Sequence, residues 1–133
     1  MSQENVEIVR RSLQAYADGD VEEMLACIDP EGELQSAIIG GAEGRVYRGH
    51  DGLRRWFAET QESFEDLKTE LTEFCDLGDR VVGFGHIHAR GRESGLELDS
   101  ATGWVFDLRA GKVVRALGFL SREDALEAAG LRE

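Results

Sequence analysis

Three long runs rich in β-branched and aromatic residues occupy most of the second half of the chain. They span Asp79–Arg92, Glu97–Leu108 and Lys112–Leu120, and a turn separates each run from the next. Gly95 and the Arg109–Gly111 turn supply flexible breaks, whereas Val, Ile, Phe and Trp supply side chains that suit a pleated, half-buried surface. This pattern predicts an antiparallel β-meander. The fold must therefore contain a sheet of consecutive strands with one face to bury.

The first half of the chain is mainly helical in pattern. Apolar residues recur at helical spacing, and residues that cap helix ends stand at the expected boundaries, with Asp20 before the second helix and Ser121 before the last. Leu53, Trp56 and Phe57 share the buried face of the third helix. The expected helical ranges are Ser2–Gly19, Asp20–Pro30, Asp51–Ser63 and Ser121–Gly130.

Two more strands are expected, over Glu33–Ile38 and Leu67–Cys75, and the glycine-rich segment Ile39–Gly49 reads as a loop. The order is then helix, helix, strand, helix, four strands and a closing helix. It indicates one α+β domain over residues 1–133. A curved antiparallel sheet with helices on one face encloses a concavity, and such concavities are where ligands bind.

The 133 residues carry a formal net charge of -12, with acidic side chains spread over the whole length. Such a surface repels phosphate backbones and anionic lipids, so neither nucleic acid nor membrane is an expected partner. The N-terminus shows no secretory pattern, and no apolar run reaches the ~20 residues that span a bilayer. We expect a cytoplasmic protein in which Cys27 and Cys75 are reduced thiols.

Short motifs join these elements at characteristic intervals. Gly19-Asp20 separates the first two helices, Asp29-Pro30 precedes the first strand, Tyr47–Phe57 leads into the third helix, and Gly111-Lys-Val-Val opens the last strand. In this order the chain resembles, over nearly its whole length, the SnoaL-like branch of the nuclear transport factor 2 (NTF2-like) superfamily. The resemblance implies a cone, in which a bent sheet wraps around the first helix and an apolar pocket opens at the wide end. It also implies a homodimer, commonly formed through the convex sheet face.

The superfamily contains ketosteroid isomerases, polyketide cyclases, epoxide hydrolases, dehydratases and binding modules without catalytic activity, so the fold does not fix the function. Ketosteroid isomerases use an Asp base, a Tyr and a protonated Asp. Counting from Gly19 places Ser36 at the base position and Ser12 at the Tyr position. Counting back from Gly111 places Thr102 at the second acid if one residue is bulged, and Gly103 there if none is. A hydroxyl cannot abstract a carbon-bound proton near neutral pH without a neighbouring base, so this reaction is not expected.

Alternation along the strands decides which side chains face the pocket. In the run Asp79–Arg92, the odd-numbered residues Val81 to Ala89 are small or apolar and suit the inner face, whereas His86, His88 and Arg90 fall on the outer face. In the next run, Thr102, Trp104 and Phe106 share the inner face, and Glu97, Asp99 and Asp107 lie on the outer face.

Two other possible sites, a hydrolase-like arrangement and a metal site, would be built from side chains on that outer face. Limonene-type epoxide hydrolases use an Asp-Arg-Asp arrangement, for which Arg90 with Asp99 and either Glu97 or Asp107 are the nearest material. All of them should point away from the pocket. His86, His88 and Asp99 could bind a metal, but they are more simply partly exposed residues, because no third ligand has suggestive spacing. No metal site and no cofactor are predicted.

The predicted pocket is apolar, with a few hydroxyl groups that would orient a ligand. Weak candidates for an acid or base are His50, Asp99 and Glu33, although His50 can equally cap the backbone at the start of its helix. The residues expected to line the pocket are Ser12, Leu13, Tyr16, Ser36, Tyr47, Trp56, Ile87, Thr102, Trp104, Phe106 and Leu120.

Three functions fit this reading. The favoured one is a protein that binds a hydrophobic or polycyclic small molecule by shape and apolar contact. The second is a SnoaL-like enzyme of the cyclase, dehydratase, isomerase or epoxide hydrolase type, with a single positioned acid or base. The third is a dimerisation module whose pocket has no function. A titratable group with a shifted pKa inside an open cavity would favour the enzyme.

Overall fold

The computed structural model describes residues 2–36 and 45–131. Its helices are α1 (Ser2–Ala17), α2 (Val21–Ala26), α3 (Gly49–Ser63) and α4 (Arg122–Ala128). Its strands are β1 (Ile28–Ser36), β2 (Val46–Arg48), β3 (Phe64–Asp76), β4 (Arg80–Gly91), β5 (Glu97–Arg109) and β6 (Lys112–Phe119). The structure is the α+β cone that the resemblance implies.

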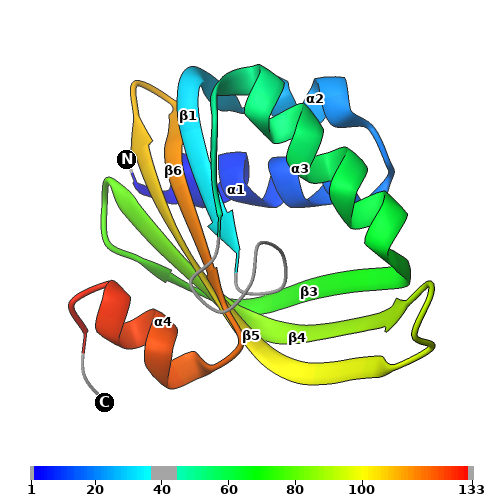
Figure 1. Cartoon of the computed structure of the whole chain (residues 1–133). Helices are drawn as coiled ribbons and strands as arrows, with labels where there is room; N and C mark the ends of the chain where they lie inside the picture. The colour runs from blue at the N-terminus through cyan, green and yellow to red at the C-terminus, as the bar shows by residue number, and fades with distance from the viewer. Residues whose placement is uncertain (1, 37–44, 132–133) are drawn as a thin grey trace.

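The strands form one mixed sheet in the order β2-β1-β6-β5-β4-β3. All neighbours pair antiparallel except β1 and β6, which run parallel. Strands β3 to β6 therefore form the predicted meander, and β1 pairs with β6 at one edge of it. Figure 1 shows the sheet curving around α1, with α2 and α3 on the same side and α4 against the opposite face.

The predicted helix caps are present. The Asp20 carboxylate accepts a hydrogen bond from the Glu23 backbone N–H at 3.1 Å, and the Ser121 hydroxyl accepts one from the Asp124 N–H at 2.9 Å. Each bond satisfies one of the backbone donors that the first turn of a helix leaves open. These caps fix where α2 and α4 begin.

The region around Pro30 differs from the expectation. The second helix ends at Ala26, and β1 begins at Ile28, which pairs with Val113 of β6. The register shifts between Ile28 and Glu33, and this irregular stretch accommodates Pro30, which lacks a backbone N–H for the ladder. Pro30 thus lies inside a bulged strand and does not mark the end of a helix.

The sequence predicts a loop over Ile39–Gly49, and this prediction is wrong for the described residues 46–49. Val46–Arg48 forms the short edge strand β2, in which Tyr47 pairs with Leu34 of β1. The helix that follows begins at Gly49, whose φ of +72° is costly for any residue with a side chain. The end of the predicted first strand, Ile38, lies outside the described residues.

Alternation divides the side chains of the sheet between two apolar clusters, as predicted. On the concave face, Val81 and Trp104 pack with residues of α1, α2 and α3. On the convex face, Val82, Phe84 and Val105 pack against Ala125 and Ala129, around α4. The Arg122 guanidinium lies 4.1 Å from the centroid of the Phe84 ring and pairs with Glu73 at 3.0 Å, which ties α4 to the outer surface.

A row of alternating charges crosses the outer face beside this cluster. Arg80 pairs with Asp107 at 2.6 Å, and Glu33 lies 3.9 Å from both Arg115 and Arg48. Arg115 is also the register partner of both Asp107 and Glu33, so the row takes one residue from each of β4, β5, β6, β1 and β2. Opposite charges on adjacent strands favour this pairing of strands over like-charge alternatives.

Cys27 and Cys75 are both free thiols, and Cys27 is buried. Within residues 2–36 and 45–131, no helix combines the length and the apolar character that crossing a membrane requires.

Glycines let β3 and β4 approach closely where the sheet bends. A Cβ atom on Gly85 would lie 1.8 Å from the Glu70 carbonyl oxygen, and one on Gly83 would lie 2.8 Å from a methyl group of Leu71. Just beyond this point the register of β3 shifts between Leu71 and Glu73. The absence of a side chain therefore permits a close contact with the backbone of β3 at Gly85 and with the Leu71 side chain at Gly83.

We expect Gly85→Ala to destabilise the protein by about 1–3 kcal/mol, because a backbone oxygen stands where the methyl group must go. Ala101→Val adds bulk at an exposed position of β5 and should change the stability by about 0.5 kcal/mol or less. Urea unfolding followed by circular dichroism measures both variants. Equal stability of Gly85→Ala and the natural protein would contradict the proposed role of Gly85.

Candidate functional site

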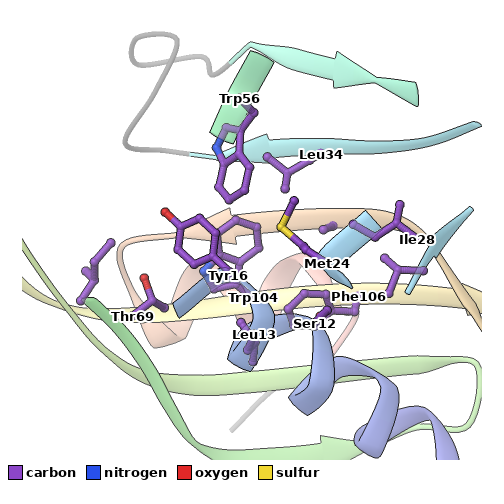
Figure 2. Close-up of a pocket in the computed structure, with 13 residues that line it drawn as sticks. Ser12, Leu13, Tyr16, Met24, Ile28, Leu34, Trp56, Thr69, Trp104 and Phe106 are labelled. Atoms are coloured by element: carbon purple, nitrogen blue, oxygen red, sulfur yellow. The ribbon is translucent and has the colours of Figure 1, made fainter. Parts of the chain in front are cut away.

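The concave side of the sheet encloses a cavity of about 60 Å³. Every element from α1 to β6 except β2 contributes to its walls, and Figure 2 shows the side chains that surround it. The lining residues are Ser12, Leu13, Tyr16, Met24, Ile28, Leu34, Trp56, Thr69, Ile87, Trp104, Phe106, Val113 and Ala116.

Helix α1 forms one wall of the cavity. Ser12, Leu13 and Tyr16 lie within one helical turn, so they share the face that the sheet wraps around. The Ser12 hydroxyl donates a hydrogen bond to the Val9 carbonyl at 2.8 Å. Its oxygen can still accept a hydrogen bond from a ligand.

Two pairs of stacked aromatic rings define the shape of the cavity. Tyr16 and Trp56 have ring centroids 5.1 Å apart with 24° between the planes, and Trp104 and Phe106 are 5.9 Å apart with 15° between the planes. The Trp104 indole lies over Gly118 of β6, where an added Cβ would come within 2.5 Å of the ring. The walls are therefore large, flat and held by packing on both sides.

The cavity is electrically neutral. Its lining, taken over the described part of the chain, includes no Asp, Glu, His, Lys or Arg, and its polar side chains are the hydroxyls of Ser12, Tyr16 and Thr69 and the indoles of Trp56 and Trp104. Burial raises the pKa of the Tyr16 phenol, and a hydrogen bond with Thr60 opposes that shift in part. Tyr16 is thus a neutral group near pH 7 and offers a hydroxyl, not a phenolate.

The structure brings together many of the residues predicted to line the pocket. Their assignment to ligand binding stays a prediction, because the structure holds no ligand. Those that line the cavity are Ser12, Leu13, Tyr16, Trp56, Ile87, Trp104 and Phe106.

The other predicted pocket residues lie elsewhere. The Tyr47 hydroxyl donates to the Glu59 carboxylate of α3, and the Thr102 hydroxyl donates to the Phe119 carbonyl at 2.7 Å. Ser36 is buried at the end of β1 without reaching the cavity lining. Leu120 follows β6, and its carbonyl accepts a hydrogen bond from Ser100 at 3.2 Å. Alternation alone does not reveal how far along a strand the cavity extends.

Several lining residues are not among those predicted from the sequence. Ile28 lies in the range expected to be helical, and the alternation of Leu34 within β1 is a local signal that could have indicated it. Val113 and Ala116 face the cavity because β6 pairs with β1, a contact between distant parts of the chain. The missed residues are Met24, Ile28, Leu34, Thr69, Val113 and Ala116.

The candidate acids and bases lie outside the cavity lining. His50 forms a hydrogen bond to the Ile28 carbonyl of β1 through Nε2 at 2.9 Å, so it bonds to the backbone of another element and does not cap its own helix. Glu33 belongs to the charged row on the outer face. Asp99 pairs with His86 on the exposed side of the sheet, and that hydrogen bond lowers the pKa of the Asp99 carboxyl. None of them is placed to act on a molecule in the cavity.

The hydrolase-like and metal-like constellations also remain on the outside. Arg90 pairs with Glu97 at 3.1 Å, and Asp107 pairs with Arg80. Among the described residues, no group of three or more His, Cys, Asp or Glu side chains is arranged to hold a metal ion. The predicted orientation of these side chains is therefore correct.

Comparison with known proteins places this geometry in a family. A sequence model of the SnoaL-like domain matches residues 9–116. No curated protein matches the chain.

Solved structures share the fold at low sequence identity. An NTF2-like protein of unknown function from Burkholderia pseudomallei is 18% identical with a TM-score of 0.79, and the match covers 93% of this chain and 95% of that chain. A putative SnoaL-like polyketide cyclase from Jannaschia is 20% identical with a TM-score of 0.77, covering 89% and 85%. TerC, crystallised with polyporic acid, is 23% identical with a TM-score of 0.76, covering 93% and 96%. These likenesses concern the fold alone.

Both tyrosines of the chain should resist ionisation. Burial raises the pKa of Tyr16, and burial together with the Glu59 carboxylate raises that of Tyr47. At pH about 10, where a free tyrosine is half ionised, we expect clearly less than half of the full tyrosinate absorbance for the folded protein, rising to about half after unfolding in guanidinium. Because the protonated phenols are favoured in the fold, their contribution to stability is present below pH about 10 and is lost as the pH rises through the raised pKa. Half-ionisation of the folded protein at pH about 10 would contradict this picture.

Proposed function

The chain belongs to the SnoaL-like domain family, and we propose that it binds a small, uncharged, apolar ligand in the cavity on the concave side of the sheet. The supporting observation is the lining itself, which combines aromatic and aliphatic side chains with three hydroxyls and, among the described residues, no charged group. Burying an unpaired charge there would be strongly unfavourable, whereas burying apolar surface contributes ~25 cal/mol per Å². The ligand is therefore held mainly by shape and apolar contact.

The size of the cavity restricts the ligand. A water-sized group needs about 10–15 Å³ on this scale, so 60 Å³ accommodates about five such groups. A single small ring fits without rearrangement. A polycyclic ligand would require the Tyr16 and Trp56 rings, or their neighbours, to move apart. TerC shares the fold and was crystallised with polyporic acid, which supports a ligand-binding role for a cavity of this kind.

An enzymatic role is the second candidate. The observation that favours this role is Tyr16. Among the described residues that line the cavity, Tyr16 alone has a titratable phenol. A neutral phenol in an apolar site can donate a hydrogen bond to a substrate carbonyl and polarise it. The Jannaschia protein with this fold is a putative polyketide cyclase. Loss of any turnover in Tyr16→Phe, with ligand affinity kept, would favour the enzyme.

The remaining expectations stay predictions. They include the homodimer, the dimerisation module, the cytoplasmic location and the absence of nucleic acid among the partners. Helix α4 already packs on Val82, Phe84 and Val105 of the convex face. A dimer formed through that face would therefore need to include α4, or to use the part of the outer face that carries the row of alternating charges.

A thermal-shift screen tests the binding role. A ligand at about ten times its Kd contributes about 1.4 kcal/mol and should raise the Tm by about 5 °C. The panel runs from single-ring hydrocarbons and ketones to polycyclic compounds, and the smallest rings should act without a change in structure. A panel in which no compound raises the Tm at high micromolar concentration would contradict the proposal.

Ala116→Leu should abolish the response, because the larger side chain fills a cavity of only about 60 Å³. Ala101→Leu, at an exposed position of β5, is the matched control and should keep it. Isothermal titration with the strongest ligand should show at least a ~10-fold loss of affinity for Ala116→Leu. Circular dichroism checks that both variants fold, and equal affinities would place the ligand elsewhere.

A further inference from the structure

On the inner face of the sheet, large side chains of β5 lie beside small residues of β6. Trp104 is the register partner of Gly118, and Phe106 is the register partner of Ala116. Trp104, Phe106 and Ala116 all line the cavity. Residues opposite each other on antiparallel strands have Cβ positions about 4.5–5.5 Å apart, so each pair shares one space above the sheet. The side chains of β5 therefore occupy room that β6 leaves open.

The Trp104 indole packs directly on the backbone of Gly118. A Cβ atom added to Gly118 would lie 2.5 Å from the indole Cζ2 and 2.7 Å from both Cε2 and Cη2. Gly118 does not have a positive φ, so its backbone conformation is open to other residues. It is the indole ring that excludes a side chain at position 118.

Trp104 is also held on its other sides. Its register partner on β4 is Gly83, and a Cβ added to Gly83 would meet Leu71 at 2.8 Å and Phe74 at 3.2 Å. The space over Gly83 is therefore already filled. Phe106 stacks on the indole with 5.9 Å between the ring centroids. Trp104, which is 9% exposed, is thus a fixed part of the cavity wall.

The indole fills room that a ligand could otherwise use. The cavity beside it measures about 60 Å³. In a packed protein core, an engineered void of ~150 Å³ left by shortening one side chain can bind benzene. An indole is one of the largest side chains, so shortening Trp104 would add space for a further ring next to the existing cavity.

We propose that Trp104, packed on Gly118, sets the size limit of the ligand site and restricts its natural occupant to a compound with a single ring. This inference rests on the proposed function and specifies the residue that excludes larger ligands from the same cavity. The curved sheet and its helices enclose enough room for two fused rings, and the indole takes up the place of the second. Ligands of two rings are therefore rejected by one side chain.

Benzene and naphthalene test this limit, since both are uncharged hydrocarbons and differ by one fused ring. NMR titration gives the Kd of each probe for the natural protein and for Trp104→Leu, which shortens the side chain by about one ring. The hydration of each probe is the same with both proteins, so it cancels when they are compared. We expect Trp104→Leu to increase the affinity for naphthalene relative to benzene at least ~10-fold.

Phe84→Leu is the matched control, because it shortens a buried aromatic side chain of β4 that packs in the cluster around α4 and not in the cavity. It should change the affinity ratio less than about 2-fold. An unchanged ratio in Trp104→Leu, with benzene still bound, would overturn the proposal and leave apolar binding intact. So would naphthalene binding as tightly to the natural protein as to Trp104→Leu. If neither probe binds to either protein, the proposed function fails along with this inference.

A second variant keeps Trp104 and narrows the site from β6. Ala116 lines the cavity, and Gly118, two residues further along the strand, shares its face of the sheet. The methyl group of Gly118→Ala must therefore displace the indole away from the sheet and into the cavity. We expect the affinity for benzene to fall at least ~5-fold.

Gly103→Ala is the control for this variant, because its Cβ would meet the Ala125 Cβ at 2.5 Å, on the side of the sheet that α4 covers. It crowds the protein to a similar degree and should change the affinity for benzene less than about 2-fold. Circular dichroism checks that both variants fold. Full affinity for benzene in Gly118→Ala would show that the indole can withdraw without narrowing the site, and would overturn the proposal.

Discussion

The close approach of β3 and β4 at Gly83 and Gly85 is the constraint on which the rest of this fold depends. A flat sheet could pack against α1 along its whole length and would leave no cavity. In this curved sheet, Thr69, Ile87, Trp104 and Phe106 of three neighbouring strands line one cavity. At Gly85 the strands β3 and β4 make a backbone contact that a side chain would prevent.

The chain separates its charge from this cavity by strand alternation. The chain has a net charge of -12, and on the outer face of the sheet Arg80, Asp107, Arg115 and Glu33 alternate across neighbouring strands. One residue away along the same strands, Phe106 and Leu34 face inwards and are apolar. Among the described residues, the cavity lining is therefore neutral although the chain is rich in carboxylates.

Local patterns predicted much of this arrangement. The helical spacing of Ser12, Leu13 and Tyr16 and the alternation around Ile87 and Trp104 place these residues correctly, because both patterns depend on neighbours in the chain. The start of β1, the strand β2 and the parallel pairing of β1 with β6 were not foreseen, since they depend on partners far away in the sequence. Val113 and Ala116 were missed for that reason. Thr102 was misplaced because its hydroxyl bonds to a neighbouring strand.

The contact between Trp104 and Gly118 couples the size of two side chains at the wall of the cavity. The indole occupies the space that a side chain on β6 would fill, so the two positions share one volume across adjacent strands. A smaller residue at 104 paired with a larger one at 118 would move the open space from one strand to the other while conserving the total packing. Related chains could thus diverge in ligand shape through compensating exchanges at this pair, with the backbone unchanged.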